Sequence, residues 1–280
     1  MAPITLSRPA RWPAAPSSRS SRPLWWWLLC LPFLLFLALP LAALFWQTQP
    51  ARLLANLAEP QVRQAVALSL MTTTLTTAVT VIFGTPVAYL LARHNFPFRR
   101  ALDTLLDLPT VLPPAVAGVA LLMAFGRRGI IGGLLDEWGI QIAFTQTAVV
   151  LAQTFVAAPL YVRAAILGFA TVDTELEQAA ALDGANSWQI FRRVTIPLSW
   201  MALLSGSVMT WARALGEFGA TIIFAGNYPS RTQTMPLAIY IGFELNLEVA
   251  LTLSVILVGC SFLVLIVVKR LLHRELDTGR

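Results

Sequence analysis

The chain has 280 residues, of which 57% are hydrophobic and only 12% are charged; its mean hydropathy is +0.69 and its formal net charge +6. Because a soluble domain carries about 25% charged residues, this composition excludes an ordinary soluble protein. Apolar blocks of roughly 20 residues, the length of a helix that crosses about 30 Å of hydrocarbon, predict an all-α integral membrane protein with about six transmembrane helices.

The N-terminal region divides into a polar segment and an apolar block. Residues 1–23 are rich in Arg, Ser and Pro and predict a disordered cytoplasmic N-terminus. The block 24–46 is longer than the core of a signal peptide, which has about 7 to 15 residues. Tryptophans bracket it at 25–27 and at Trp46, as at a membrane interface. We therefore expect an uncleaved first transmembrane helix over 24–46.

Five further apolar blocks follow along the chain. They are Val66–Leu91, Pro109–Phe125, Phe144–Phe169, Trp200–Ala225 and Val249–Val268. Each block is continuously apolar instead of alternating, so helices are expected and not barrel strands. Prolines 109, 113 and 114 open the third block. Such a cluster either starts a helix or marks a broken helix beside a pathway.

Lys and Arg are distributed unevenly over the predicted loops. A cytoplasmic N-terminus places on one side the basic residues Arg8, Arg11, Arg19, Arg22, Arg93, Arg99, Arg100, Arg192, Arg193, Lys269, Arg270, Arg274 and Arg280. The other side then holds Arg52, Arg63, Arg127, Arg128 and Arg231. The positive-inside rule therefore predicts an inner-membrane protein with both termini, including a tail at 271–280, in the cytoplasm. This bias accounts for the positive charge by contact with lipid headgroups, without a nucleic acid.

The residues that usually carry catalysis are scarce. Cys30 and Cys260 lie in separate apolar blocks, and His94 and His273 lie just beyond the ends of spans. The sequence contains no zinc-protease helix, no Gly-x-Ser-x-Gly turn and no phosphate-binding loop of the Gly-x-x-x-x-Gly-Lys-Ser/Thr type. We expect no catalytic site, no cofactor and no metal, and hence no enzyme.

The loop at 170–199, between the fourth and fifth spans, is too polar to cross a membrane. Two capping-box patterns, Thr174 with Glu177 and Asn186 with Gln189, predict two short helices. Gly184 separates the two helices and Pro197 is expected to close the second. The pattern alone fits either a solvated helical loop or a surface that another protein approaches closely.

This loop resembles the EAA loop of ABC importer permeases, in which Glu-Ala-Ala is followed by three residues, Gly, nine residues and Ile-x-Leu-Pro. The matching positions are Ala179, Ala180, Gly184, Val194, Ile196 and Pro197, with Gln178 in the place of the Glu and Glu177 just before it. The resemblance implies a coupling loop whose site residues are Glu177, Gln178, Ala179, Ala180, Asp183, Gly184 and Pro197. It also implies a permease domain over 62–270 of the type I ABC importer fold.

Other stretches resemble the molybdate permeases of this family. They are Val111–Gly118, Gly126–Gly129, Thr147–Ala165 and Arg213–Tyr240. The resemblance implies molybdate import with an ABC ATP-binding subunit, a periplasmic oxyanion-binding protein and a second permease copy in a homodimer. Permeases for sulfate or thiosulfate share much of this framework, and tungstate is a further alternative.

Two arginine groups near the membrane are candidate functional residues. Arg213 and Glu217 are four residues apart in the fifth block, so we expect them on one helical face. They predict an intramembrane ion pair, either for packing or for a gate. Arg127 and Arg128 follow the third block, where they suit attraction of an anion, docking of a binding protein or a plain solvated loop. A secondary transporter usually has several intramembrane carboxylates, so that class is the less favoured alternative.

Overall fold

The computed structural model describes residues 24–278, and the side chains of 28–267, 269 and 270. All regular elements in this range are helices, as the sequence predicts. The chain divides into two units, Met1–Ala43 and Leu44–Arg280. The segment 1–23, predicted to be disordered, lies outside the described residues. The first unit contains most of α1 (Leu24–Gln47), whose part Leu28–Gln47 is long and apolar enough to cross a membrane.

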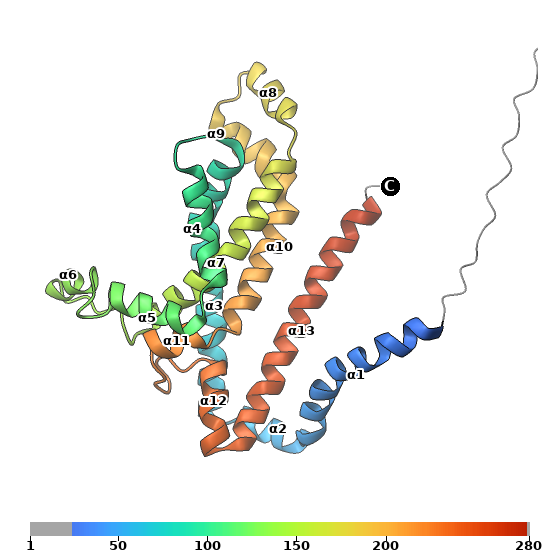
Figure 1. The fold of residues 1–280 in the computed structure, drawn as a ribbon, viewed down its shortest axis with the longest axis vertical. Helices are drawn as coiled ribbons and strands as arrows, with labels where there is room; N and C mark the ends of the chain where they lie inside the picture. The colour runs from blue at the N-terminus through green and yellow to red at the C-terminus, as the bar shows by residue number, and fades with distance from the viewer. Residues whose placement is uncertain (1–23, 279–280) are drawn as a thin grey trace, which may run out of the picture. The chain divides into compact units, whose positions relative to one another are not determined.

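Three long helices form the centre of the second unit: α3 (Pro60–Arg93), α7 (Gln146–Thr171) and α10 (Ile196–Leu215). They lie side by side (Figure 1). Tyr161 and Phe169 of α7 are fully buried among them. Gly206 of α10 permits the close approach, because a Cβ there would lie 2.8 Å from that of Ala164. Small residues commonly allow membrane helices to pack in this way.

The predicted third span is a broken pair of helices. The helix α4 (Arg99–Val111) is followed by α5 (Pro114–Phe125) after a bend of 118°. Leu112 and Pro113 have extended backbones, with ψ values of 134° and 133°. Proline disfavours the helical conformation of the residue that precedes it. It is also favoured as the first residue of a new helix. Of the two alternatives for the proline cluster, the structure shows a broken helix: Pro109 lies inside α4, the break at Leu112 and Pro113 ends that helix, and Pro114 begins α5.

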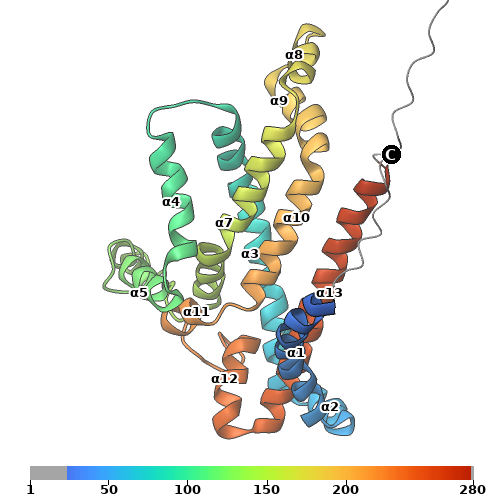
Figure 2. The same cartoon turned by 45° about the vertical axis from the view of Figure 1, so that its right-hand side comes forward.

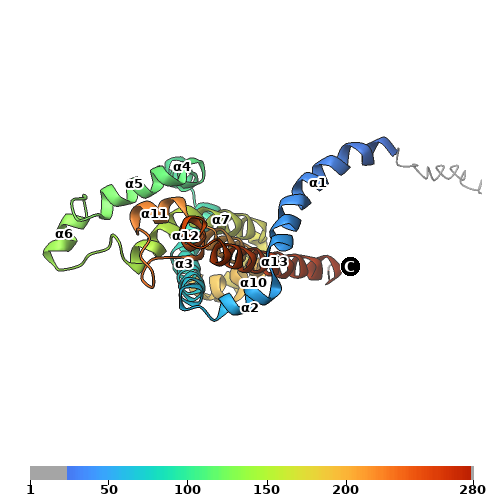
Figure 3. The same ribbon diagram turned by 90° about the horizontal axis from the view of Figure 1, so that it is seen from below.

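The predicted fifth span is also interrupted. The helix α10 ends at Leu215, and α11 (Gly219–Phe224) begins after three further residues. Gly219 packs against Pro114, because an added Cβ would lie 2.6 Å from the proline Cβ. The short helices α5 and α11 therefore cross closely, and Figure 3 shows α5 continuing away from the bundle towards α6 (Gly132–Glu137).

The remaining elements complete the second unit. Its last long helix is α13 (Leu247–Thr278), which packs against α12 (Met235–Leu245) and α2 (Pro50–Leu57). Five described helices are long and apolar enough to cross a membrane, and the bent pair α4–α5 makes a sixth candidate. The sequence did not predict α2, α6 or α12, because each is shorter than a span. Residues Thr174–Ile190 lie at the opposite end of the bundle from α12 (Figure 2).

Candidate coupling loop and intramembrane ion pairs

The loop predicted to couple to a partner contains two short helices, α8 (Thr174–Leu182) and α9 (Ser187–Ile190). The capping box at α9 is confirmed, since Asn186 Oδ1 accepts from the Gln189 amide at 2.9 Å and Gln189 Oε1 accepts from the Asn186 amide at 2.8 Å. The box predicted at Thr174 is wrong. Asp173 caps α8 instead, accepting from the Glu175 amide at 2.9 Å, because Asp is the stronger cap.

Pro197 does not close a helix. The chain is helical without interruption from Ser187 to Leu215, with a π-helical turn η1 (Phe191–Thr195) just before the proline. Proline has no amide hydrogen, and its ring clashes with the carbonyl four residues earlier in a regular α-helix. A widened turn, in which the Ile196 amide bonds to the Phe191 carbonyl, lets the helix continue past this position.

Gly184 separates the two loop helices through its backbone conformation. Its φ is +87°, a region that residues with a side chain rarely adopt. No atom of the chain lies within 4 Å of the position that a Cβ would occupy there. Asp183, just before it, ends α8. The glycine is therefore required within this chain for the turn, and the space beside it is open.

Glu177 anchors the loop to the bundle. Its Oε1 accepts from Arg93 Nη2 of α3 at 3.2 Å and from the Thr195 hydroxyl at 2.7 Å. Arg93 also donates to the Val172 carbonyl at 2.8 Å. The side chains of Arg93 and Glu177 are only 12% and 16% exposed. A charge-assisted contact in this environment is stronger than one in water, so α8, α3 and η1 meet at one carboxylate.

Aromatic rings surround the same junction. Tyr89 of α3 contacts Phe191 of η1 with ring centroids 4.8 Å apart, and Phe169 of α7 at 5.6 Å. Both arrangements are edge-to-face, which is favourable for aromatic pairs. The loop is therefore joined to α3 and α7 by apolar packing as well as by the ion pair, so a displacement of the loop would be passed to these helices.

The outer surface of the loop is open and partly apolar. Leu182 is 89% exposed and Trp188 is 65% exposed. Gln178 and Ala179, which precede Leu182 in α8, are also exposed, and Ala180 is half-buried. Gln178, which stands where the family pattern has Glu, therefore makes no inward contact of the kind that Glu177 makes. Large apolar side chains on a polar loop are typical of a protein contact.

Arg213 and Glu217 are brought together, though not on one helix. Arg213 Nη1 lies 2.8 Å from Glu217 Oε2. Glu217 follows the end of α10, so the expectation that both residues lie on one helical face is wrong; Gly216 ends the helix between them. The other oxygen, Oε1, accepts from the Ala220 amide of α11 at 2.9 Å. Glu217 is 2% exposed, so this buried carboxylate bridges the break between α10 and α11.

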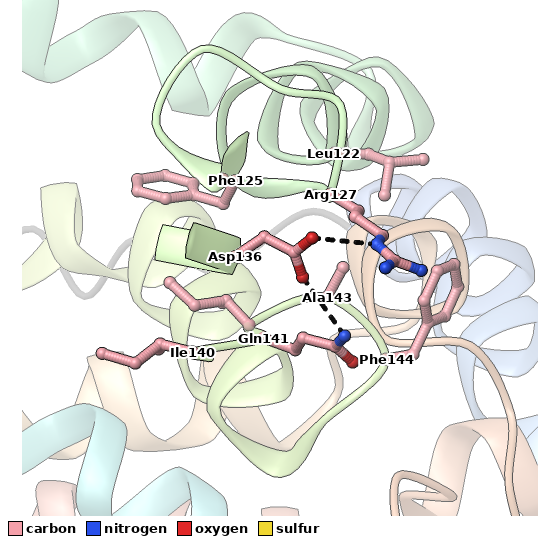
Figure 4. A pocket seen from close by; sticks show the side chains of 10 residues that line it. Leu122, Phe125, Arg127, Asp136, Ile140, Gln141, Ala143 and Phe144 are labelled. Carbon is pink, nitrogen blue, oxygen red and sulfur yellow. Dashed lines mark hydrogen bonds and ion pairs between the residues drawn. The ribbon is translucent and has the colours of Figure 1, made fainter. Parts of the chain in front are cut away.

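Arg127 lies at a small pocket of about 180 Å³ beside α6 (Figure 4). Its Nε donates to Asp136 Oδ2 at 3.0 Å, and Gln141 Nε2 donates to Asp136 Oδ1 at 3.3 Å. Two hydrogen bonds lower the pKa of Asp136; the bond from Arg127 has the larger effect and the bond from Gln141 the smaller. The carboxylate of Asp136 is therefore charged at neutral pH. Its contribution to stability is lost only as the pH falls below the ordinary pKa of an aspartate. Arg128 is exposed.

The sequence analysis did not predict a further charged cluster, which joins α7 to α4. Arg163 of α7 forms ion pairs with Asp103 at 2.6 Å and with Asp107 at 2.5 Å, both on α4. An arginine within an apolar block requires a partner, and this requirement was the signal that sequence reasoning missed. Within the described ranges, no group of three or more His, Cys, Asp and Glu side chains is arranged to hold a metal.

Sequence comparison relates most of the chain to transport proteins. The family model described as "binding-protein-dependent transport system inner membrane component" matches residues 81–278. The molybdenum transport system permease protein ModB of Mycobacterium tuberculosis is 42% identical over 244 residues, 87% of this chain and 92% of that protein. The Escherichia coli K12 protein of that name is 47% identical over 178 residues, covering 63% and 78%. The E. coli K12 sulfate permease CysW is 42% identical over 186 residues, covering 66% and 64%.

Solved structures share the fold at low sequence identity. A bacterial ABC transporter that imports alginate has a TM-score of 0.68 at 16% identity, covering 92% of this chain and 97% of that one. The methionine transporter MetNI in an inward-facing conformation has a TM-score of 0.59 at 21% identity, covering 78% and 98%. These structures confirm the ABC importer permease fold. With the match over residues 81–278, they lead to one conclusion: the chain belongs to the family of inner-membrane components of binding-protein-dependent transport systems.

Proposed function

We propose that this chain is the permease subunit of an ATP-driven molybdate importer. The observation that carries the proposal is the 42% identity to a molybdenum permease over 87% of the chain and 92% of that relative. The sulfate permease is equally identical over only 66% of the chain, so sulfate is the second candidate. The relatives are named as permeases, which supports a transport subunit without catalytic residues of its own.

In the proposed complex, two copies of the chain form the pathway as a homodimer in the inner membrane. An ATP-binding subunit would contact the loop 170–199 on the cytoplasmic side, where both termini would also lie. A periplasmic oxyanion-binding protein would deliver the anion at the opposite end, near Arg127 and Arg128. The exposed Leu182 and Trp188 support a protein contact at the loop.

The proposed mechanism is conformational. Closure of two ATP-binding subunits would draw the coupling loops together, and the rigid junction at Glu177 would transmit this movement to α3 and α10. A transporter of this kind alternates between two packed arrangements and does not deform continuously. The Arg213–Glu217 pair at the break after α10 suits a gate, since a broken span can swing at its break.

Deletion of the encoding gene tests the substrate. Cells that lack the chain should lose high-affinity molybdate uptake and regain molybdoenzyme activity when molybdate is supplied in excess. Uptake is measured with labelled molybdate at low concentration, and re-expression of the chain is the control. Intact molybdate uptake together with a requirement for reduced sulfur would replace molybdate by sulfate.

A further inference from the structure

Arg163 is held in a fork between two aspartates. Its Nε donates to Asp107 Oδ1 at 2.7 Å and its Nη2 donates to Asp107 Oδ2 at 2.5 Å. Its Nη1 donates to Asp103 Oδ1 at 2.6 Å, and Nη2 also donates to the Asp103 carbonyl at 3.1 Å. A guanidinium has five N–H donors, and four contacts occupy most of them. The cluster carries one cation and two anions, so its net charge is −1.

The cluster lies within the depth of the membrane. The helix α7 has 26 residues, which at about 1.5 Å per residue span about 39 Å, roughly 9 Å more than a hydrocarbon core. Arg163 precedes the end of α7 at Thr171 by 171 − 163 = 8 residues, or about 12 Å. With α7 centred in the bilayer, Arg163 therefore stands about 7 Å inside the hydrocarbon boundary at the coupling-loop end.

The three charged side chains are partly exposed on the surface of the single chain. The side chains of Arg163, Asp103 and Asp107 are 36%, 48% and 49% exposed. A charged side chain that faces lipid costs on the order of 3 kcal/mol or more, and such residues face protein or a water-filled cavity. Because the cluster keeps a net charge, lipid is the least favourable neighbour for this face.

The helix α4 has a polar flank and an apolar flank between Arg100 and Thr110. The polar flank consists of Arg100, Asp103, Asp107 and Thr110, which are three or four residues apart. The opposite flank is apolar, with Leu105 61% and Leu108 47% exposed. On the polar flank, Thr110 is also exposed. A helix exposed on both flanks, one polar and one apolar, lies at a boundary between water and an apolar environment.

We propose that the polar flank of α4, with Arg163, forms the wall of a water-filled cavity within the membrane, and that the apolar flank lies outside this cavity. Since the two aspartates mask its guanidinium, Arg163 is not a free cation that would retain a passing anion. The location of the cavity follows from the charges of this chain. Its assignment to the anion pathway rests on the proposed function.

Cysteine labelling tests the proposal with positions on both flanks. Thr110→Cys lies on the polar flank, and Leu105→Cys and Leu108→Cys lie on the apolar flank, about 140° and about 160° around the helix from Thr110. Cys30 and Cys260 are first replaced by Ser. A charged, membrane-impermeant thiol reagent is added to inside-out vesicles, and the amount of each variant in the membrane is measured by immunoblot. We expect labelling at least about tenfold faster on the polar flank, because only a hydrated thiol ionises readily to the reactive thiolate.

Equally slow labelling of all three positions would overturn the proposal, because the polar flank would then be covered by protein or lipid. Equally fast labelling would overturn it too, since α4 would then be in water on both flanks. Labelling requires no transport, so molybdate uptake is measured separately in intact cells that express the same variants. If no molybdate uptake is found but the labelling difference between the flanks persists, the proposed function is refuted and the proposed cavity stands.

Discussion

Glu217 shows how one carboxylate can hold two helices across a break. Its two oxygens bond to Arg213 before the break and to the Ala220 amide after it. The carboxylate is almost fully buried, whereas Arg213 is 37% exposed. Loss of the negative charge therefore leaves a partly buried cation without its partner, and replacement of both charges removes that penalty.

We predict that Glu217→Gln is more harmful than the double change Arg213→Met with Glu217→Gln. Removing one member of a buried pair costs on the order of 3 kcal/mol, less here because Arg213 is partly exposed. The glutamine retains an oxygen for the Ala220 amide, so the comparison isolates the charge. Membrane assembly and uptake are assayed separately. Restored assembly without uptake supports a gate, restoration of both supports packing, and strictly additive damage would contradict the pairing.

Single residues also mark the limit of sequence reasoning. The pairing of Arg213 with Glu217 could be predicted from their spacing, but the helix end at Gly216 could not, because glycine is common within membrane helices. Glu177 was placed in the correct loop, and its contact with Arg93 was not foreseen because 84 residues separate the two. Arg163 was overlooked since its partners lie just before the expected start of the third span.

At the scale of elements, the loop 170–199 depends on a turn that only glycine adopts easily. Gly184 and Gly139 both have positive φ, at +87° and +73°, and neither has an atom within 4 Å of an added Cβ. They form a matched pair, because a side chain at either position strains the backbone alike. Only Gly184 lies in the loop 170–199; Gly139 follows α6.

We therefore predict that Gly184→Val uncouples ATP hydrolysis from transport, whereas Gly139→Val does not. Both variants should reach the membrane in similar amounts. Co-purification of the ATP-binding subunit and anion-stimulated ATPase activity are the measurements. Wild-type values for Gly184→Val, or the same loss in both variants, would contradict a specific role of the loop.

Span positions were more predictable than span shapes. Length and hydropathy placed α3, α7 and α13 well, because hydrophobic blocks of that length have few alternatives in a membrane. The bend of 118° at Leu112–Pro113 and the end of α10 depend on local backbone geometry and on packing of α5 against α11. The sequence left both outcomes open at the proline cluster, and tertiary packing decides between them.

At the scale of the whole molecule, the described part of the chain places its functional groups at separate levels. The loop 170–199 lies at one end of the bundle, the Arg163 cluster joins α7 to α4, and Glu217 lies beyond the far end of α10. Each level contains one rigid ionic contact beside a turn or bend. This arrangement suits a subunit that transmits movement and catalyses no reaction itself.

Reconstitution tests the central claim most directly. The purified permease is incorporated into lipid vesicles with its ATP-binding subunit and supplied with the periplasmic binding protein, and accumulation of labelled molybdate is measured with and without ATP. We predict accumulation that requires ATP and all three proteins and that persists when the proton gradient is collapsed. Accumulation without ATP that disappears with the proton gradient would contradict the account, as would ATP-dependent uptake of sulfate with none of molybdate.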